Sequence, residues 1–117
     1  NSANMNDIPI NVSQKSHKKE SILITGLPYK TDYSNSSLDN MIQDMQQWQK
    51  IRMIGSAAMA ACYIASGKAE KYQENGIYLW DVIAGAAIVE SAGGKAEIVN
   101  QRENFQVDVI FSNSKVK

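Results

Sequence analysis

Apolar and polar residues change their spacing along the chain, and these changes predict where strands and helices lie. Short runs that are continuously apolar or strictly alternating are typical of strands. Pro9 lacks a ladder donor and puts the first strand at a sheet edge, whereas the apolar run Ile22–Thr25, ended by Gly26 and Pro28, indicates an interior strand. We expect strands over residues 8–12, 22–25, 51–54, 69–74, 95–99 and 107–112.

A first helix is expected from Ser36 or Ser37, either of which can cap it, to about Lys50. Apolar residues recur along it at spacings of three and four, while Asp and Gln residues lie elsewhere. We therefore expect an amphipathic helix whose apolar stripe packs in the core. The stripe consists of Leu38, Met41, Ile42, Met45 and Trp48.

A second helix is expected from Ala57 to about Ser66, after a turn at Gly55-Ser56. Its many alanines permit very close packing against a sheet, and Gly67 closes it. The polar segments on either side of the second strand are expected to be loops, over residues 13–21 and 29–35.

The stretch from Glu74 to Asp81 turns at Asn75-Gly76 and leads into a third helix, which is apolar on every side. Asp81 is expected at the helix start, where its oxygens would accept hydrogen bonds from unpaired N–H groups. The helix should end at Gly93-Gly94. Because Val82–Val89 carries no charge, we expect both faces of this helix to be covered and the helix to be the most buried of the three.

This alternation of strands and helices predicts a layered α/β domain, with a mixed sheet flanked by helices. From its length of 117 residues, the chain is expected to form a single domain. Twelve basic and twelve acidic residues balance, so composition favours neither a nucleic-acid nor a membrane partner. Cys62 is the single cysteine and is expected to be a buried, inert thiol in a reducing compartment, the cytoplasm. Because the chain opens on Asn1 without an initiator Met, we expect it to be a piece of a longer protein.

Two places in the sequence carry candidate chemistry. Gly55-Ser56-Ala57-Ala58 puts unpaired backbone N–H groups at a helix start directly after a strand, where they can face an oxygen-rich ligand. Glu74 and Asp81 put two carboxylates on either side of a turn. Each also has a simpler interpretation: Ser56 and Asp81 as ordinary caps, and Glu74 as a solvated carboxylate. His17 lacks a neighbouring carboxylate to orient it and is expected to be a solvated loop residue.

The spacing of these motifs resembles the C-terminal half of the inositol monophosphatase family. The resemblance begins in the segment 8–13, which is similar to the hairpin before the family's central strand, and continues to Ser112-Asn113. The Trp-Asp box followed by a Gly-Gly helix end is its most specific part. The matching residues are Arg52, Gly55-Ser56-Ala57-Ala58, Gly67, Glu74, Gly76, Trp80-Asp81, Ala84-Gly85, Glu90 and Ala92-Gly93-Gly94.

The resemblance implies a lithium-sensitive, Mg²⁺-dependent phosphomonoesterase with αβαβα layers, acting on inositol or related sugar phosphates. It implies that Asp81 ligates a second metal close to the substrate hydroxyl and that Glu74 accepts a hydrogen bond from a substrate hydroxyl. The segment Gly55-Ser56-Ala57 would line the substrate pocket. No residue of the chain is assigned as a catalytic base or nucleophile.

The sequence departs from the family in one respect. It has no counterpart of the Asp-Pro-hydrophobic-Asp-Gly-(Ser/Thr) loop or of the Glu-Glu segment, which carry most of the family's metal ligands. We therefore expect the chain to be the substrate-side domain of a phosphatase that needs a missing N-terminal half and is inactive alone. The alternatives are a 3′(2′),5′-bisphosphate nucleotidase, a fructose bisphosphatase or a noncatalytic interaction domain, and a homodimer of the longer protein stays open.

Overall fold

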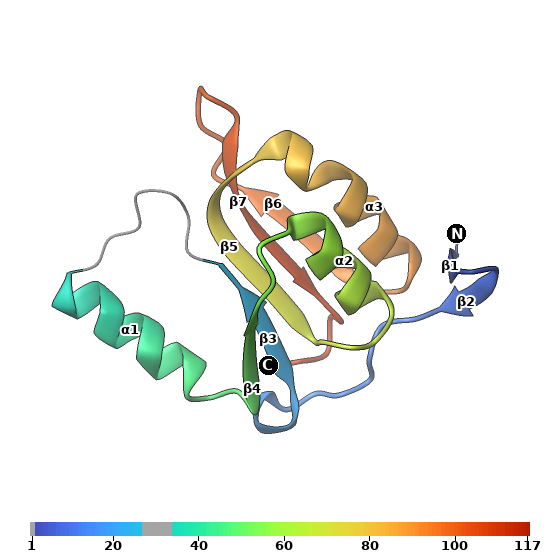
Figure 1. The fold of residues 1–117 in the computed structure, drawn as a ribbon, viewed down its shortest axis with the longest axis horizontal. Coiled ribbons are helices and arrows are strands. Elements are labelled where there is room, and N and C mark those ends of the chain that lie inside the picture. The colour runs from blue at the N-terminus through green and yellow to red at the C-terminus, as the bar shows by residue number, and fades with distance from the viewer. Residues whose placement is uncertain (1, 27–33) are drawn as a thin grey trace.

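The computed structural model describes residues 2–26 and 34–117, which form a mixed sheet of five strands with helices (Figure 1). The layered α/β class predicted from the sequence is confirmed. Across the sheet the order is β4-β3-β5-β7-β6. The strands are β3 (Ile22–Thr25), β4 (Lys50–Met53), β5 (Lys71–Tyr78), β6 (Lys95–Val99) and β7 (Gln106–Ser112).

Three neighbouring strands of this sheet are parallel. β3 pairs in parallel with β4 and with β5, whereas β7 is antiparallel to β5 and to β6. The parallel pairs need crossovers, which contain α1 (Asn35–Met45) between β3 and β4 and α2 (Ala57–Ala65) between β4 and β5. The carboxyl ends of β3 and β4 therefore lie at one edge of the sheet, beside β5, which is where open α/β sheets bind ligands.

A separate hairpin precedes the sheet. β1 (Ala3–Met5) pairs antiparallel with β2 (Ile8–Ile10) through a tight turn whose two residues both have positive φ, 52° at Asn6 and 65° at Asp7. The strand predicted around Pro9 and the hairpin implied by the resemblance are thus present. A short 3-10 helix, η1 (Lys18–Glu20), interrupts the predicted loop 13–21, and most of the predicted loop 29–35 lies outside the described residues.

The core lies between the sheet and one pair of helices, α2 and α3 (Ile83–Ser91), which cover the same face (Figure 1). Val107, Val109 and Phe111 alternate along β7 and are buried beneath the helices. Small residues bring the two helices close together, whereas the alanines of α2 were expected to permit close packing against the sheet. A Cβ at Gly85 of α3 would lie only 2.7 Å from the Cβ of Ala61, so glycine permits this contact.

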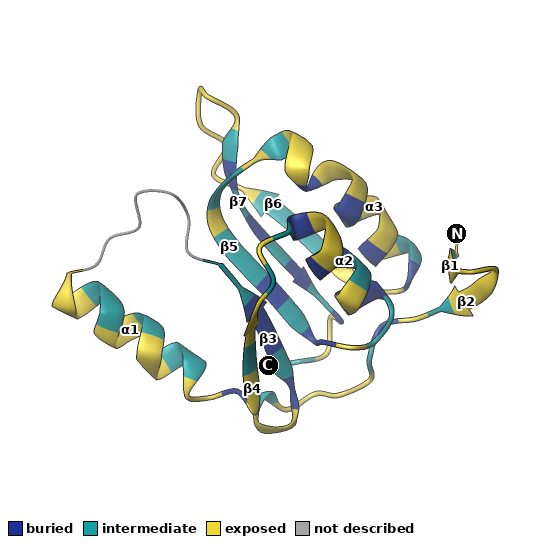
Figure 2. Ribbon diagram, in the orientation of Figure 1, coloured by how far each residue is buried: buried dark blue, intermediate teal, exposed yellow. Residues whose placement is uncertain are grey.

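The prediction that α3 is covered on both faces and is the most buried helix is wrong. Gly85 and Val89 on its inner side are buried, as is the N-cap Val82, but Ile83 is 54% exposed and Ile88 is 38% exposed. Figure 2 shows the outer side of both α2 and α3 as exposed. The apolar sequence required two covering layers, whereas the described residues supply only one, the sheet. The more buried helix is α2, with five buried residues against two in α3.

The core role predicted for the first helix is also wrong. α1 has no buried residue, and Ile42 on its apolar stripe is 48% exposed. The helix lies away from the face that α2 and α3 cover (Figure 1), and Asp44 near its end accepts a hydrogen bond from Gln73 of β5. Its cap is Ser34, earlier than predicted, and it ends at Met45, so Trp48 lies in the following turn, where it is buried.

Other boundaries agree with the sequence or shift by a few residues. Gly93, with φ of 94°, follows the last turn of α3, and Gly67, with φ of 78°, follows α2. Cys62 is half-buried, so the expectation of a buried thiol is wrong. Among the described residues, no helix has both the length and the hydropathy needed to cross a membrane.

Candidate functional site

A pocket of about 410 Å³ lies at the carboxyl edge of the parallel strands. Gly26 directly follows β3, and Gly55 follows β4 before the chain enters α2. β5 contributes Glu74 and Ile77 from the neighbouring strand. The pocket therefore forms where three parallel strands and a helix start meet. Its lining residues are Gly26, Met53, Ile54, Gly55, Ser56, Ala57, Glu74 and Ile77.

The start of α2 supplies one wall of this pocket. Gly55 adopts φ of 77°, a left-handed conformation that favours glycine and turns the chain from β4 into the helix. Ser56 is the N-cap, and its hydroxyl accepts a hydrogen bond from the N–H of Met59 at 3.1 Å. The simpler interpretation of Ser56 is thus confirmed, although Ser56 also lines the pocket. The first-turn N–H groups and the positive end of the helix dipole lie at this wall, where an anionic oxygen would be stabilised.

Glu74 supplies the facing carboxylate, and its position is closely defined. The hydroxyl of Tyr72, two residues earlier on the same strand, donates a hydrogen bond to Glu74 Oε1 at 3.0 Å. Any Cβ at Gly26 would overlap the same carboxylate, so the end of β3 has room for Glu74 only because residue 26 has no side chain. Glu74 is consequently held in the pocket between β3 and the phenol of Tyr72.

Tyr72 is buried in the core, with 2% of its surface exposed, and its ring lies 5.7 Å from that of Phe111. Burial, the charge of Glu74, the hydrogen bond to Glu74 and the charge of Asp81 together raise the pKa of the Tyr72 phenol well above its usual range. The phenol therefore stays protonated and remains a donor. Its titration also responds to both carboxylates that the sequence singled out, Glu74 and Asp81.

A bulge in β5 separates the positions of Glu74 and Asp81. Pairing with β7 shifts register between Glu74 and Ile77, so the turn predicted at Asn75-Gly76 is an irregularity within a longer strand. Both backbone groups of Gly76 are held by side chains: its N–H donates to Asp108 Oδ1 at 3.0 Å, and its carbonyl accepts from Gln106 Nε2 at 2.9 Å.

Asp108 connects Gly76 to two further side chains. Besides Gly76, its carboxylate accepts hydrogen bonds from Asn100 at 2.9 Å and from Arg102 at 3.0 Å. Burial alone would raise the pKa of Asp108, but the hydrogen bonds from Asn100, Arg102 and Gly76 and the Arg102 charge outweigh it and lower that pKa. The charged form of Asp108 is thus favoured by the folded state.

Replacing Asp108 by Asn should therefore destabilise the chain at neutral pH by about 1 kcal/mol, a value kept low because Arg102 is partly exposed to solvent. Because the pKa of Asp108 is lower in the folded chain than in the unfolded chain, its charge stabilises the fold at any pH above the unfolded-state pKa. This stabilisation is lost as the pH falls through the folded-state pKa. The difference between wild type and Asp108→Asn in urea unfolding should accordingly shrink from neutral pH to acid pH. The control is Glu97→Gln, whose ion pair with Lys95 is exposed and should contribute almost nothing. A constant difference across pH would show that the charge of Asp108 is not involved.

Asp81 lies outside the lining of the pocket and does not cap α3. It ends a 3-10 helix, η2 (Leu79–Asp81), and the N-cap of α3 is Val82, without a side-chain hydrogen bond. The prediction that Asp81 caps the helix is wrong, because Asp81 is the last residue of η2 and α3 begins only after Val82. The backbone anchors η2 to the β6–β7 loop, since Leu79 N–H donates to Phe105 O at 2.9 Å. The Asp81 carboxylate is exposed.

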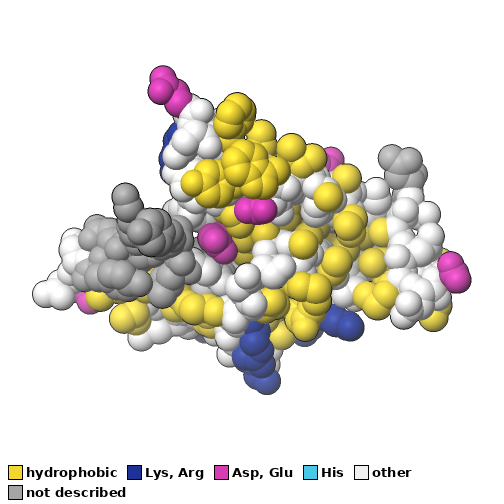
Figure 3. Space-filling view, turned by 45° about the horizontal axis from the view of Figure 1, so that its top comes forward, with side chains coloured by type: hydrophobic (Ala, Val, Ile, Leu, Met, Phe, Trp, Pro, Cys, Tyr) yellow, Lys and Arg dark blue, Asp and Glu magenta, His cyan; other side chains and the backbone are white. Residues whose placement is uncertain are grey.

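Exposed aromatic rings lie next to Asp81 in the sequence. Trp80 is 62% exposed and stacks on Tyr78, with ring centroids 4.8 Å apart and an angle of 6° between the planes. Phe105 from the β6–β7 loop completes the cluster at 6.3 Å from Trp80. Figure 3 shows hydrophobic side chains across one face of the molecule with acidic groups beside them. Trp80 and Asp81 are therefore both at the molecular surface, and the Asp81 carboxylate is accessible to a ligand.

The donor set fits a Mg²⁺ ion only in part. Glu74 and Asp81 offer the hard oxygen atoms that Mg²⁺ prefers. Within residues 2–26 and 34–117, however, no group of three or more Asp, Glu, His or Cys residues lies close enough to hold a metal. Asp81 could serve as one ligand of a site whose other ligands come from elsewhere.

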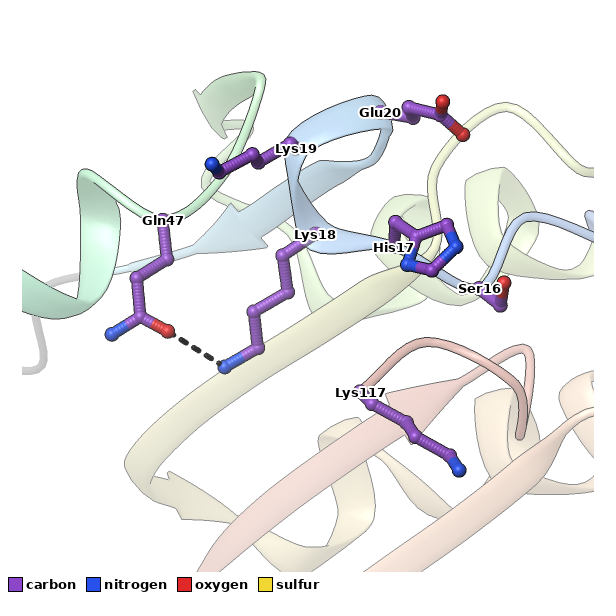
Figure 4. Close-up of a pocket in the computed structure, with 7 residues that line it drawn as sticks. All are labelled: Ser16, His17, Lys18, Lys19, Glu20, Gln47 and Lys117. Atoms are coloured by element: carbon purple, nitrogen blue, oxygen red, sulfur yellow. Dashed lines mark hydrogen bonds between the residues drawn. The ribbon is translucent and has the colours of Figure 1, made fainter.

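A second, larger hollow of about 590 Å³ lies at the other end of β3 (Figure 4). It contains His17, Lys18 and Lys117, and Lys18 Nζ donates to Gln47 Oε1 at 3.2 Å. His17 lies in this loop region and makes no contact with the carboxylates of the candidate site, consistent with the expected loop residue. Lysines in this hollow cannot act on a ligand at the carboxyl edge, so the smaller pocket is the candidate site.

The structure adds Gly26 and Tyr72 to the residues singled out from the sequence. The sequence marked Gly26 only as the end of a strand, and Tyr72 only as part of an alternating segment. A signal was present for Gly26, because residues that follow parallel strands meet at one edge. No local pattern shows that the Tyr72 hydroxyl reaches Glu74, although residues i and i+2 of a strand share a face.

These features define the class: an α/β domain with a carboxylate and a helix start facing each other at the carboxyl edge of a mixed sheet. The chain belongs to the inositol monophosphatase family, since the family model of that description matches residues 1–116. The resemblance noted in the sequence is therefore confirmed.

Individual relatives agree with this assignment. The chain is 41% identical over 93 residues to an inositol monophosphatase of Mesembryanthemum crystallinum, covering 77% of this chain and 34% of that protein. It is 36% identical over 96 residues to Nus factor SuhB of Pasteurella multocida, covering 79% of this chain and 35% of that protein. A solved inositol monophosphatase from Anabaena superposes with a TM-score of 0.80 at 30% identity, covering 95% of this chain and 46% of that one. The chain thus spans about a third of the length of these sequence relatives.

Proposed function

We propose that the chain is the C-terminal, substrate-side domain of a Mg²⁺-dependent phosphatase acting on inositol or related sugar phosphate monoesters. The longer protein that would contain it is called the parent below. The observation that carries the proposal is the pocket in which Glu74 faces the start of α2 at Gly55, Ser56 and Ala57, in a chain that belongs to this family.

Each residue of the pocket then has a chemical role. The backbone N–H groups at the start of α2 face oxygen atoms of the substrate. Glu74 accepts a hydrogen bond from a hydroxyl of the sugar or inositol ring, since its ionised carboxylate is a pure acceptor. Gly26 and Gly55 leave the space for the ring, because neither places a side chain in the pocket.

Asp81 is the residue that would hold Mg²⁺, as one anionic ligand among several. When bound, Mg²⁺ would supply Lewis-acid stabilisation of charge on the phosphate and leaving oxygens. An exposed carboxylate that makes no capping hydrogen bond is free to take this role. The remaining ligands are assigned to the N-terminal half of the parent, and the isolated chain is assigned no activity. Cytoplasmic localisation is part of the same proposal.

A noncatalytic interaction domain is the second candidate. One observation favours it: several relatives carry the name Nus factor SuhB, which does not describe a hydrolase. The broad exposed apolar surface on α3, with Ile83 and Ile88, would suit such a role equally well.

Replacing Glu74 by Gln in the parent tests the first candidate. A charge-assisted hydrogen bond to substrate contributes about 1.5–3 kcal/mol, so preference for inositol and sugar phosphates over an aryl phosphate without neighbouring hydroxyls should fall about tenfold or more. The Mg²⁺ requirement should stay nearly unchanged, since Glu74 is not assigned to metal. kcat/KM for each substrate and a Mg²⁺ titration measure both quantities.

Glu97→Gln is the matched control, because it removes an exposed carboxylate on β6 that lies outside the pocket. It should leave both the preference and the Mg²⁺ requirement at their wild-type values. An unchanged substrate preference in Glu74→Gln, or a large rise in the Mg²⁺ needed, would refute the role given to Glu74.

A further inference from the structure

We propose that Tyr72 is a positioning residue that fixes the carboxylate of Glu74 for its contact with a substrate hydroxyl. This inference rests on the function proposed above and adds to it a residue that does not itself line the pocket. Tyr72 would act on substrate preference only through Glu74.

The hydrogen bond between the two residues follows from the strand. Tyr72 and Glu74 are two positions apart on β5, so their side chains project from the same face of the sheet. Gln73 projects from the opposite face, where it donates to Asp44 of α1 at 3.1 Å. The bond of 3.0 Å from the Tyr72 hydroxyl to Glu74 Oε1 therefore runs along one strand, directly from the core to the pocket.

Packing makes Tyr72 a rigid donor. Its ring is 2% exposed and packs against Phe111, so the hydroxyl cannot move away without disturbing the core. A phenylalanine would fill the same space, and packing alone does not require the hydroxyl. The hydroxyl is a buried polar group that needs a partner, and Glu74 is the partner present.

The bond also makes the two carboxylate oxygens of Glu74 inequivalent. Oε1 accepts from Tyr72 and lies nearest the space that a side chain at Gly26 would take. Among the described residues, no hydrogen bond to Oε2 is present. One oxygen is thus tied to the core, and the other stays available for a substrate hydroxyl. A carboxylate held in one orientation binds a hydroxyl better than one that must first be ordered.

The test measures the ratio of kcat/KM for inositol 1-phosphate to kcat/KM for 4-nitrophenyl phosphate in the parent. Tyr72→Phe keeps the ring and should lower this ratio about tenfold, with the Mg²⁺ requirement unchanged. Tyr72→Phe in the Glu74→Ala background should lower it no further, because no carboxylate is left there to position. Tyr63→Phe removes a phenol from the outer side of α2, away from the pocket, and should leave the ratio at its wild-type value.

The variant Phe111→Leu tests whether weaker packing of the core, and not a lost hydrogen bond to Glu74, could lower the ratio. This variant weakens the ring contact of Tyr72 and should lower the unfolding temperature more than Tyr72→Phe does, while changing the ratio less. If Glu74→Gln shifts the ratio and Tyr72→Phe does not, the positioning role is overturned and the proposed function stands. If Tyr72→Phe lowers the ratio further in the Glu74→Ala background, Tyr72 does not act through Glu74 and the inference is overturned. If Glu74→Gln itself leaves the ratio unchanged, the proposed function and this inference fall together.

Discussion

Replacing Asp81 by Asn in the parent should lower turnover of inositol phosphates at least about a hundredfold. Even residues that only orient a metal ligand typically cost 10–100-fold in metal affinity or activity, so loss of an anionic ligand should cost at least as much. The Mg²⁺ concentration needed for half-maximal rate should rise as well, because an amide binds Mg²⁺ more weakly than a carboxylate. Steady-state turnover across a Mg²⁺ titration measures both effects.

The structure makes this substitution informative, because Asp81 is not a helix cap. Val82 is the N-cap of α3, and the Asp81 side chain is exposed, so Asn at position 81 should leave the free energy of unfolding nearly unchanged. Asp39→Asn, an exposed carboxylate on α1, is the matched control and should behave as wild type in turnover and in Mg²⁺ dependence. Near wild-type turnover of Asp81→Asn would leave Asp81 without a metal role.

Much of the fold could be predicted from the spacing of apolar residues. The runs that became β3, β6 and β7 are bounded by clear turn residues, and their strands begin and end within one residue of the prediction. α2 was predicted equally well, because Ser56 and Gly67 mark its two ends. In these segments local propensity and the tertiary structure agree.

Burial could not be predicted as well, because it depends on what lies against each element. α3 is apolar all round, and such a pattern indicates two covering layers. Only one is present among the described residues, so Ile83 and Ile88 remain exposed. α1 has the apolar spacing that is typical of a helix packed against a core, yet none of its residues is buried. A periodic pattern shows that a face is apolar, and does not show which part of the chain or which partner covers it.

The candidate site was only partly accessible from the sequence. Gly55, Ser56, Ala57 and Glu74 were named together through a family resemblance, and they line one pocket. Their proximity depends on the parallel pairing of β3 with β4 and β5, which joins residues far apart in the chain. The contribution of Gly26 and the hydrogen bond from Tyr72 depend on side-chain geometry at that edge, which no local spacing specifies.

Activity of the isolated chain should be absent, although its pocket is formed. Phosphate monoesters are among the slowest compounds to hydrolyse without catalysis, so a measurable rate requires the whole metal site. Mg²⁺ gives up its waters reluctantly, and one exposed carboxylate at Asp81 cannot replace a set of anionic ligands. Circular dichroism and thermal unfolding of the isolated chain show whether it is folded, so that absence of activity is not loss of structure.

Whether this chain forms one wall of a phosphatase site is tested most directly by phosphate release from inositol 1-phosphate, measured for the parent and the folded isolated chain across one Mg²⁺ titration. We expect Mg²⁺-dependent release by the parent and none above the uncatalysed rate by the isolated chain. Robust Mg²⁺-dependent release by the isolated chain, or a parent that hydrolyses neither inositol nor sugar phosphates at any Mg²⁺ concentration, would contradict the assignment.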